Sequence, residues 1–186
     1  MLAANVAIVT TGPTSAEFRD AVSHFATGIT VVTCRVGGVD HAMTANSFTS
    51  VSLEPLLVLV CVEREARFHD AIDSSGQWAV SLLAAEAELI SRWLATKGRP
   101  LHGQLDTVGH RRGPVTGAAI LTDCLASLEC RTHSVFPGGD HDIVVGEVLA
   151  IDVSAESNSS PLLYFRRGYH HLDQKARESG STTGVE

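Results

Sequence analysis

The segment from Met43 to Ser52 carries the densest group of side chains that could bind a ligand. Threonine, serine and asparagine follow one another there, with few bulky residues between them. Small polar side chains let a flat ligand lie against the backbone, whose N–H and C=O groups can pair with the polar edge of a heteroaromatic ring. The hydroxyl groups could meet phosphate oxygens. A polar loop that satisfies its own turns is the alternative interpretation.

Two other positions could supply a charge or a hydrogen bond to the same ligand. Arg67 follows an apolar run and precedes a predicted helix, where an arginine beside backbone donors can hold phosphate. His141 follows Gly138-Gly139-Asp140, and two glycines permit a close approach of ligand or backbone. The alternatives are a solvated surface arginine and a histidine that caps a turn.

Motifs for several other chemistries are missing. The sequence has no GxGxxG after a strand, no GxxxxGK[ST] and no GxSxG elbow. Its histidines form neither an HExxH motif nor a Cys/His array, so we predict no metal site. The formal net charge is -7 and the 14 basic residues are scattered, which argues against binding of nucleic acid.

The cysteines and the apolar runs indicate where the protein works. Four cysteines occur without a CxxC pair, which is typical of reduced thiols in a cytoplasmic protein. The stretch from Met1 to Gly12 lacks the basic region of a signal peptide. The longest apolar run, Leu56 to Val62, is too short to cross a bilayer. We therefore expect a soluble, cytoplasmic protein without a membrane partner.

The hydrophobic pattern predicts many strands and few helices. Thr14 and Glu17 form a capping box, and the helix after it should turn Phe18, Ala21, Val22 and Phe25 toward a core. Further helices are expected over Arg67–Ser75 and Ala84–Ala95. Strands are expected over Ile29–Cys34, His41–Ala45, Leu56–Val62, Trp78–Leu83, Ala126–Arg131 and Ile143–Val153. Because Leu56 to Val62 is apolar at every position, we expect it to be covered on both faces.

These elements predict one mainly β domain, an antiparallel barrel with peripheral helices, because helices and strands do not alternate. We expect residues 1–14 to be a flexible N-terminal segment, 15–172 the folded domain and 173–186 a disordered polar tail. The irregular segment from Lys97 to Gly117 is long for a compact domain, and such loops often cover a site.

Several stretches, in this order, resemble one known family. They are Phe25–Thr33, Met43–Val62, Leu128–Cys130, Gly139–Val148, Pro161–Tyr164 and Gly168-Tyr169. Together they are similar to the short-chain flavin reductases, the reductase components of two-component flavin-dependent monooxygenases. The likeness runs from about Phe18 to Leu172, nearly the whole predicted domain.

The resemblance implies a split β-barrel of the FMN-binding type, Greek-key in topology, that works as a homodimer. It implies an oxidoreductase that transfers hydride from NADH or NADPH to FMN or FAD and supplies reduced flavin to a partner monooxygenase. The cofactors carry the electronics, so the protein must stack and align them and exclude water.

The same resemblance assigns candidate site residues. The catalytic candidate is His141, which we expect to orient the nicotinamide. The cofactor-binding candidates are Thr30, Met43, Thr44, Ala45, Asn46, Ser47, Ser50, Cys61, Val62, Arg67, Phe68 and Tyr169. Among them, Thr44 to Ser47 would line the isoalloxazine ring, Arg67 and Phe68 would meet the phosphate end, and Tyr169 would approach the nicotinamide.

Two other functions fit a split barrel. A non-catalytic flavin or haem binder would retain its cofactor tightly and consume no NADH or NADPH. A relative of the pyridoxamine-phosphate oxidases would gather several basic residues on the phosphate, whereas only Arg67 stands near that position. The stretch Gly139-Asp140-His141 favours the reductase over both.

Overall fold

The computed structural model describes residues 12–154 and 159–172 of the chain. The predictions of a flexible segment and a disordered tail concern residues 1–14 and 173–186, of which only 12–14 are among the described residues. Within these two ranges no helix combines the length and the apolar character that a membrane crossing requires.

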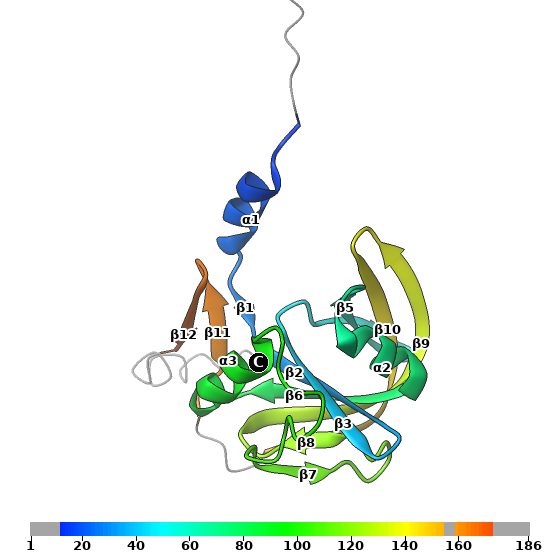
Figure 1. Ribbon diagram of the computed structural model, residues 1–186. Helices are drawn as coiled ribbons and strands as arrows, with labels where there is room; N and C mark the ends of the chain where they lie inside the picture. Colours follow the sequence, from blue (N-terminus) through cyan, green and yellow to red (C-terminus); the bar gives the residue numbers. More distant parts are fainter. Residues whose placement is uncertain (1–11, 155–158, 173–186) are drawn as a thin grey trace, which may run out of the picture.

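A seven-stranded antiparallel sheet forms the body of the molecule, and it curls around an apolar interior (Figure 1). Its strands, in sheet order, are β3 (Val39–Ala45), β2 (Thr30–Val36), β6 (Gln77–Leu83), β9 (Cys124–Gly138), β10 (His141–Val153), β5 (Leu56–Glu63) and β4 (Thr49–Leu53). Strands far apart in sequence, such as β2 and β6, are neighbours in the sheet. The mainly β prediction is confirmed.

Helix α2 (Arg67–Ser75) packs into the interior of the curled sheet. Its apolar side buries Phe68, Ala71 and Ile72 in a cluster that includes Val60 and Val62 of β5. The predicted bounds of this helix are confirmed. Gly76, in the left-handed conformation at φ 61°, ends it, because a residue without Cβ adopts that conformation at no steric cost.

Strand β5 departs from its prediction. Val58, Val60 and Val62 are buried, whereas the side chains between them are only half-buried and Leu56 is 45% exposed. The prediction that both faces are covered is therefore wrong for the single chain. Successive side chains of a strand point to opposite faces, and only one face of β5 looks toward α2 and the interior.

Two smaller sheets lie beside the main one. One small sheet joins β1 (Thr27–Gly28), β11 (Leu162–Phe165) and β12 (Gly168–His171), and another joins β7 (His110–Arg112) and β8 (Ala119–Leu121). The predicted helix over Ala84–Ala95 is present as a 3₁₀ turn, η1 (Ala85–Ala87), followed by α3 (Glu88–Ala95). A second apolar cluster, which includes Leu83, Leu94 and Leu121, packs beneath α3.

Helix α1 (Ser15–Ser23) begins with the predicted capping box but buries none of its residues. Figure 1 shows it standing apart from the sheet. Phe18 is 63% exposed and Phe25 is 74% exposed, so the prediction that this side faces a core is wrong within the single chain. Phe25 lies beyond the end of the helix, so the predicted helical spacing holds for Phe18, Ala21 and Val22 but not for Phe25. Among the described residues no surface buries these side chains.

The segment from Lys97 to Gly117 is largely irregular, as predicted, yet it is firmly held. Leu105 and Val108 are buried in the cluster beneath α3. The buried Glu129 carboxylate accepts hydrogen bonds from the backbone N–H groups of Val115 (3.0 Å) and Thr116 (2.7 Å). These contacts fix the far end of the segment against β9.

Strands β9 and β10 form a hairpin that is longer than predicted and ends at Gly139-Asp140. Gly146 lets this hairpin pass close to a neighbouring strand. A Cβ at Gly146 would lie 2.2 Å from Cζ2 of Trp78, which is fully buried on β6. Figure 1 shows the tip of the hairpin curving away from the rest of the sheet.

Candidate functional site

A cavity of about 580 Å³ opens between β3, β5, α2 and the segment after α3. Its size lies in the range of sites for small molecules and cofactors. Its lining residues are His41, Ala42, Met43, Thr44, Ala45, Asn46, Ser47, Cys61, Glu63, Glu65, Ala66, Arg67, Phe68, Leu94, Ala95, Thr96, Lys97, Gly98, Arg99, Gln104 and His141.

The structure gathers most of the predicted site residues around this cavity. The lining includes nine of them: Met43, Thr44, Ala45, Asn46, Ser47, Cys61, Arg67, Phe68 and His141. The other four predicted residues lie outside the lining of this cavity. Thr30 and Val62 are buried, Ser50 is exposed on β4, and Tyr169 lies on β12.

Strand β3 presents an open edge to the cavity. It is the outermost strand of the sheet and, among the described strands, it pairs only with β2. At Ala42 the outward N–H and C=O are bonded by the side chains of Gln104 (3.4 Å) and Arg99 (2.8 Å), which replace a further strand. Because backbone groups of an antiparallel strand alternate in direction, Thr44 also turns its N–H and C=O outward. That pair can bind the polar edge of a ring.

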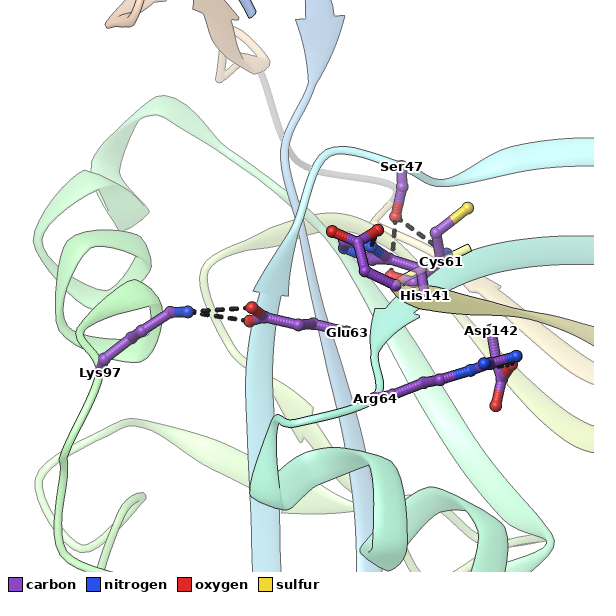
Figure 2. A network of polar contacts seen from close by, with 8 residues as sticks. Ser47, Cys61, Glu63, Arg64, Lys97, His141 and Asp142 are labelled. Carbon is purple, nitrogen blue, oxygen red and sulfur yellow. Dashed lines mark hydrogen bonds and ion pairs between the residues drawn. The ribbon is translucent and has the colours of Figure 1, made fainter. Parts of the chain in front are cut away.

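Ser47 fastens the polar loop after β3 to β5. Its hydroxyl accepts a hydrogen bond from the Cys61 N–H (3.0 Å) and donates one to the Cys61 C=O (3.2 Å) (Figure 2). The loop therefore lies beside the end of β5. The small side chains of Ala45 and Ser47 leave room for a flat group above the backbone.

The N-terminus of α2 supplies a site for negative charge. Ala66, the N-cap residue, has no side chain that could bond the N–H groups of the first turn. The Ala66 and His69 N–H groups donate to the backbone C=O of Glu63 and Ala66, which leaves the N–H groups of Arg67 and Phe68 for a ligand. Ala66, Arg67 and Phe68 all line the cavity. The Arg67 guanidinium donates a hydrogen bond to the backbone C=O of Arg99. A phosphate would meet both backbone donors and a cation here.

Charged side chains surround the mouth of the cavity. Lys97, after α3, reaches the Glu63 carboxylate at the end of β5, with N···O distances of 3.0 and 3.1 Å (Figure 2). His41 lies at the same cavity, and burial lowers its pKa despite the neighbouring Asp40. Burial, with Arg67 nearby, also lowers the pKa of Arg99.

His141 reaches the cavity from the first residue of β10. Its partner in the sheet is Glu63 of β5, which places the ring beside Cys61 and Glu63 at the cavity mouth (Figure 2). Its Nδ1 lies 2.7 Å from Oδ1 of Asp140. This hydrogen bond to His141 lowers the pKa of the Asp140 carboxyl. The imidazole is partly exposed, so its other nitrogen can meet a ligand.

Tyr169 connects to the cavity through α3. The Ser91 hydroxyl donates to the Tyr169 hydroxyl (3.1 Å), and the Ser91 C=O accepts from the Thr44 hydroxyl (2.7 Å). The Arg92 guanidinium lies over the Tyr169 ring, 4.3 Å from its centroid. In this chain Tyr169 therefore supports the helix that holds Thr44, and its predicted approach to the nicotinamide stays a prediction.

Sequence reasoning missed His41, Glu63, Lys97, Arg99 and Gln104 in the cavity. The segment from Lys97 to Gly117 was recognised as a possible cover, but no local pattern indicates that Arg99 and Gln104 bond a strand some 60 residues earlier. Among the described side chains, no cluster of three or more His, Cys, Asp or Glu could hold a metal ion.

Comparison with known proteins places the chain in a family. Residues 22–173 match the flavin reductase like domain. The chain belongs to the flavin reductase like family.

Named relatives of this family member include the reductase component of a monooxygenase and an FMN reductase. The reductase component of 4-hydroxyphenylacetate 3-monooxygenase from Thermus thermophilus is 41% identical over 155 residues, which are 83% of this chain and 95% of the relative. The NADH-dependent FMN reductase AsuE2 of Streptomyces nodosus subsp. asukaensis is 40% identical over 165 residues, 87% of each chain.

A solved structure agrees with the fold of this family member. The NADH:FAD oxidoreductase SgcE6 of Streptomyces globisporus, in complex with NAD and FAD fragments, is 35% identical and has a TM-score of 0.79. The match covers 85% of this chain and 92% of that one. The prediction of a split barrel of the flavin reductase type is confirmed.

Proposed function

We propose that this chain is an NAD(P)H-dependent flavin reductase that binds FMN or FAD in the 580 Å³ cavity and reduces it with NADH or NADPH. One observation carries the assignment to this cavity. The open edge of β3 and the uncapped start of α2 border the same space, so a ring and a phosphate of one ligand can both be bound.

The residues present fit such a ligand. The outward N–H and C=O of Thr44 suit the alternating donors and acceptors of a flavin ring, and the small residues Ala45 and Ser47 allow the ring to approach the backbone. Arg67 and the first turn of α2 suit the phosphate.

The chain's own task is to bind, to align and to exclude water. When both are bound, the nicotinamide supplies a hydride and the flavin accepts it. No side chain has to act as nucleophile or strong base. The segment after α3 is bonded to the cavity's other elements through Arg99 and Ala42 and through Lys97 and Glu63, and in this place it would limit the access of water to bound cofactors.

We assign His141 the task of orienting the nicotinamide. A His141→Ala variant should raise KM for the nicotinamide roughly three- to tenfold, the effect of losing a hydrogen bond of about 1 kcal/mol, and leave the flavin Kd nearly unchanged. Steady-state assays with each nicotinamide and each flavin, crossed, measure both quantities. His133→Ala, at a histidine on β9 outside the cavity lining, is the matched control. An equal loss for both ligands would contradict this role, and no turnover in any wild-type combination would refute the reductase.

We also propose that the protein works as a homodimer. The proposal is supported by exposed apolar side chains on α1 and just after it, among them Phe18, Val22 and Phe25. Monomeric proteins seldom expose several large apolar side chains so close together. Light scattering should give twice the chain mass of 19.7 kDa. Phe25→Asp should shift the protein toward the monomer, and a wild-type monomer at micromolar concentration would disprove the dimer.

A flavin-dependent monooxygenase in the cytoplasm is the proposed consumer of the reduced flavin. The Thermus thermophilus relative is named as the reductase component of a monooxygenase, which supports this pairing. Burial raises the pKa of the Cys34 and Cys130 thiols to about 12, so both suit a reducing compartment as inert apolar groups. Product formation by an added monooxygenase should depend on this protein and on flavin, without a stable complex.

A further inference from the structure

The tip of the β9–β10 hairpin carries His141 but is poorly anchored by packing. Every residue from 135 to 140 is exposed, and Phe136 is 53% exposed. The backbone ties the tip to β5 through the ladder that starts at His141↔Glu63 and through the Arg64 N–H, which donates to the Asp140 C=O (3.0 Å). Side chains must provide any further restraint.

Asp142 provides that restraint with both of its carboxylate oxygens. Oδ1 accepts hydrogen bonds from Nε (2.8 Å) and Nη2 (2.7 Å) of Arg64, and Oδ2 lies 2.8 Å from Nε2 of His69 (Figure 2 shows the Arg64 side). The Asp142 side chain is only 15% exposed and that of His69 24%. Arginine, carboxylate and imidazole thus join the hairpin to α2 and to the turn before it.

Successive side chains of β10 point to opposite faces of the strand, which separates Asp142 from the cavity. His141 faces the cavity, whereas Asp142 points to the opposite face, where α2 lies. Asp142 therefore cannot touch a ligand in the cavity. It can only determine where the adjacent residue is held.

Helix α2 does not need this contact in return. Phe68, Ala71 and Ile72 bury its apolar side in the main core, so the helix keeps its place when the carboxylate is removed. The anchor is asymmetric: the helix is the fixed point and the hairpin tip is what it holds.

We propose that Asp142 is a positioning residue for hydride transfer, which holds His141 at the nicotinamide through its contacts with Arg64 and His69. This inference rests on the proposed function of His141. The flavin would be bound at β3, which Asp142 does not contact, and at the start of α2, which its core packing keeps in place without Asp142. Loss of the Asp142 carboxylate should therefore raise KM for the nicotinamide and leave the flavin Kd nearly unchanged.

The test compares Asp142→Asn with Asp152→Asn. Asp152 lies at the far end of β10 and also pairs with an arginine, Arg111, but on the exposed surface. Asp142→Asn should raise KM for the nicotinamide roughly three- to tenfold, as far as loss of His141 itself would, while the flavin Kd stays within about twofold. Asp152→Asn should change neither value.

A double variant tests whether Asp142 acts through His141. In the His141→Ala background, Asp142→Asn should add less than about twofold to KM, because two changes in one pathway are not additive. Full additivity would overturn the inference, and so would an equal rise in the flavin Kd. If His141→Ala alone leaves KM unchanged, the proposed role of His141 fails instead, and the two failures are distinguished.

Amide hydrogen exchange gives a readout that does not depend on turnover. In Asp142→Asn, exchange at residues 138–142 should accelerate while exchange in α2 stays as in the wild type. Asp142→Glu, which keeps the charge, should restore part of the protection. If Asp142→Asn does not fold, Arg64→Gln and His69→Gln each remove one partner and leave the carboxylate in place. Unchanged exchange and unchanged KM in these variants would also overturn the proposal.

Discussion

Helix α2 and the β9–β10 hairpin both reach the cavity, but they are held there by different forces. The helix buries Phe68, Ala71 and Ile72, and the free energy of that burial needs no charge. The hairpin tip has exposed side chains and is held by its backbone ladder with β5 and by the contacts of Asp142 with Arg64 and His69. On the proposed assignments, α2 is a rigid wall that would meet the phosphate, and the hairpin tip is an adjustable wall that would meet the nicotinamide.

The largest expected effect is a loss of stability when the core contacts of α2, the rigid wall, are reduced. Ile72→Ala should lower the free energy of unfolding by about 2–5 kcal/mol, because it removes a buried side chain and leaves a cavity. Chemical denaturation measures the loss. Leu89→Ala, at a side chain of α3 that is 80% exposed, should change stability by less than about 0.5 kcal/mol. Similar losses for both variants would show that α2 is not anchored by its core contacts.

A smaller effect should come from the charge on the rigid wall. Arg67→Ala should weaken FMN binding roughly tenfold or more, since a charge-assisted hydrogen bond to phosphate is worth about 1.5–3 kcal/mol. Binding of riboflavin, which has no phosphate, should stay the same in a fluorescence titration. Arg64→Ala is the control, because Arg64 pairs with Asp142 and is absent from the cavity lining. Equal losses for FMN and riboflavin would remove Arg67 from the phosphate end.

The smallest expected effect is a pH dependence of stability that arises from the contact between His69 and Asp142, which holds the hairpin tip, the adjustable wall. The hydrogen bond to Asp142, aided by Asp70, raises the pKa of His69 above its ordinary value of 6.5. Because the pKa of His69 is higher in the folded chain than in the unfolded chain, protonated His69 stabilises the fold. This contribution is complete below the pKa that His69 has in the unfolded chain, and it is lost as the pH rises through its pKa in the folded chain. Hydrogen bonds from Arg64 and His69 lower the pKa of Asp142 below 3.8, so its contribution is lost only in stronger acid.

Melting temperatures measured at different pH values test whether the contribution of His69 to stability falls as the pH rises. From about pH 6 to pH 9 the wild type should lose stability relative to His69→Gln, which cannot titrate there. Asp70→Asn, which removes the weaker and fully exposed partner at 3.6 Å, should keep most of the pH dependence. A wild type whose advantage grows with pH would contradict the assignment of charge on His69.

Part of the fold and of the site follows from the order of the residues alone. The capping box at Thr14 and the helix bounds Arg67–Ser75 are set by neighbours a few positions away, so the sequence predicts them. The resemblance to a family then placed His141 and the stretch from Met43 to Ser47 at one cavity, as the structure has them.

Only the tertiary structure decided the rest, because those contacts join positions whose separation follows no local period. His69 and Asp142 are 73 residues apart, and Arg99 and Ala42 are 57 apart. The helical spacing of Phe18 and Val22 predicts an apolar side of α1, yet it cannot say whether that side is covered within this chain. Periodicity determines which side chains share a face, and the packing of distant segments determines what that face meets.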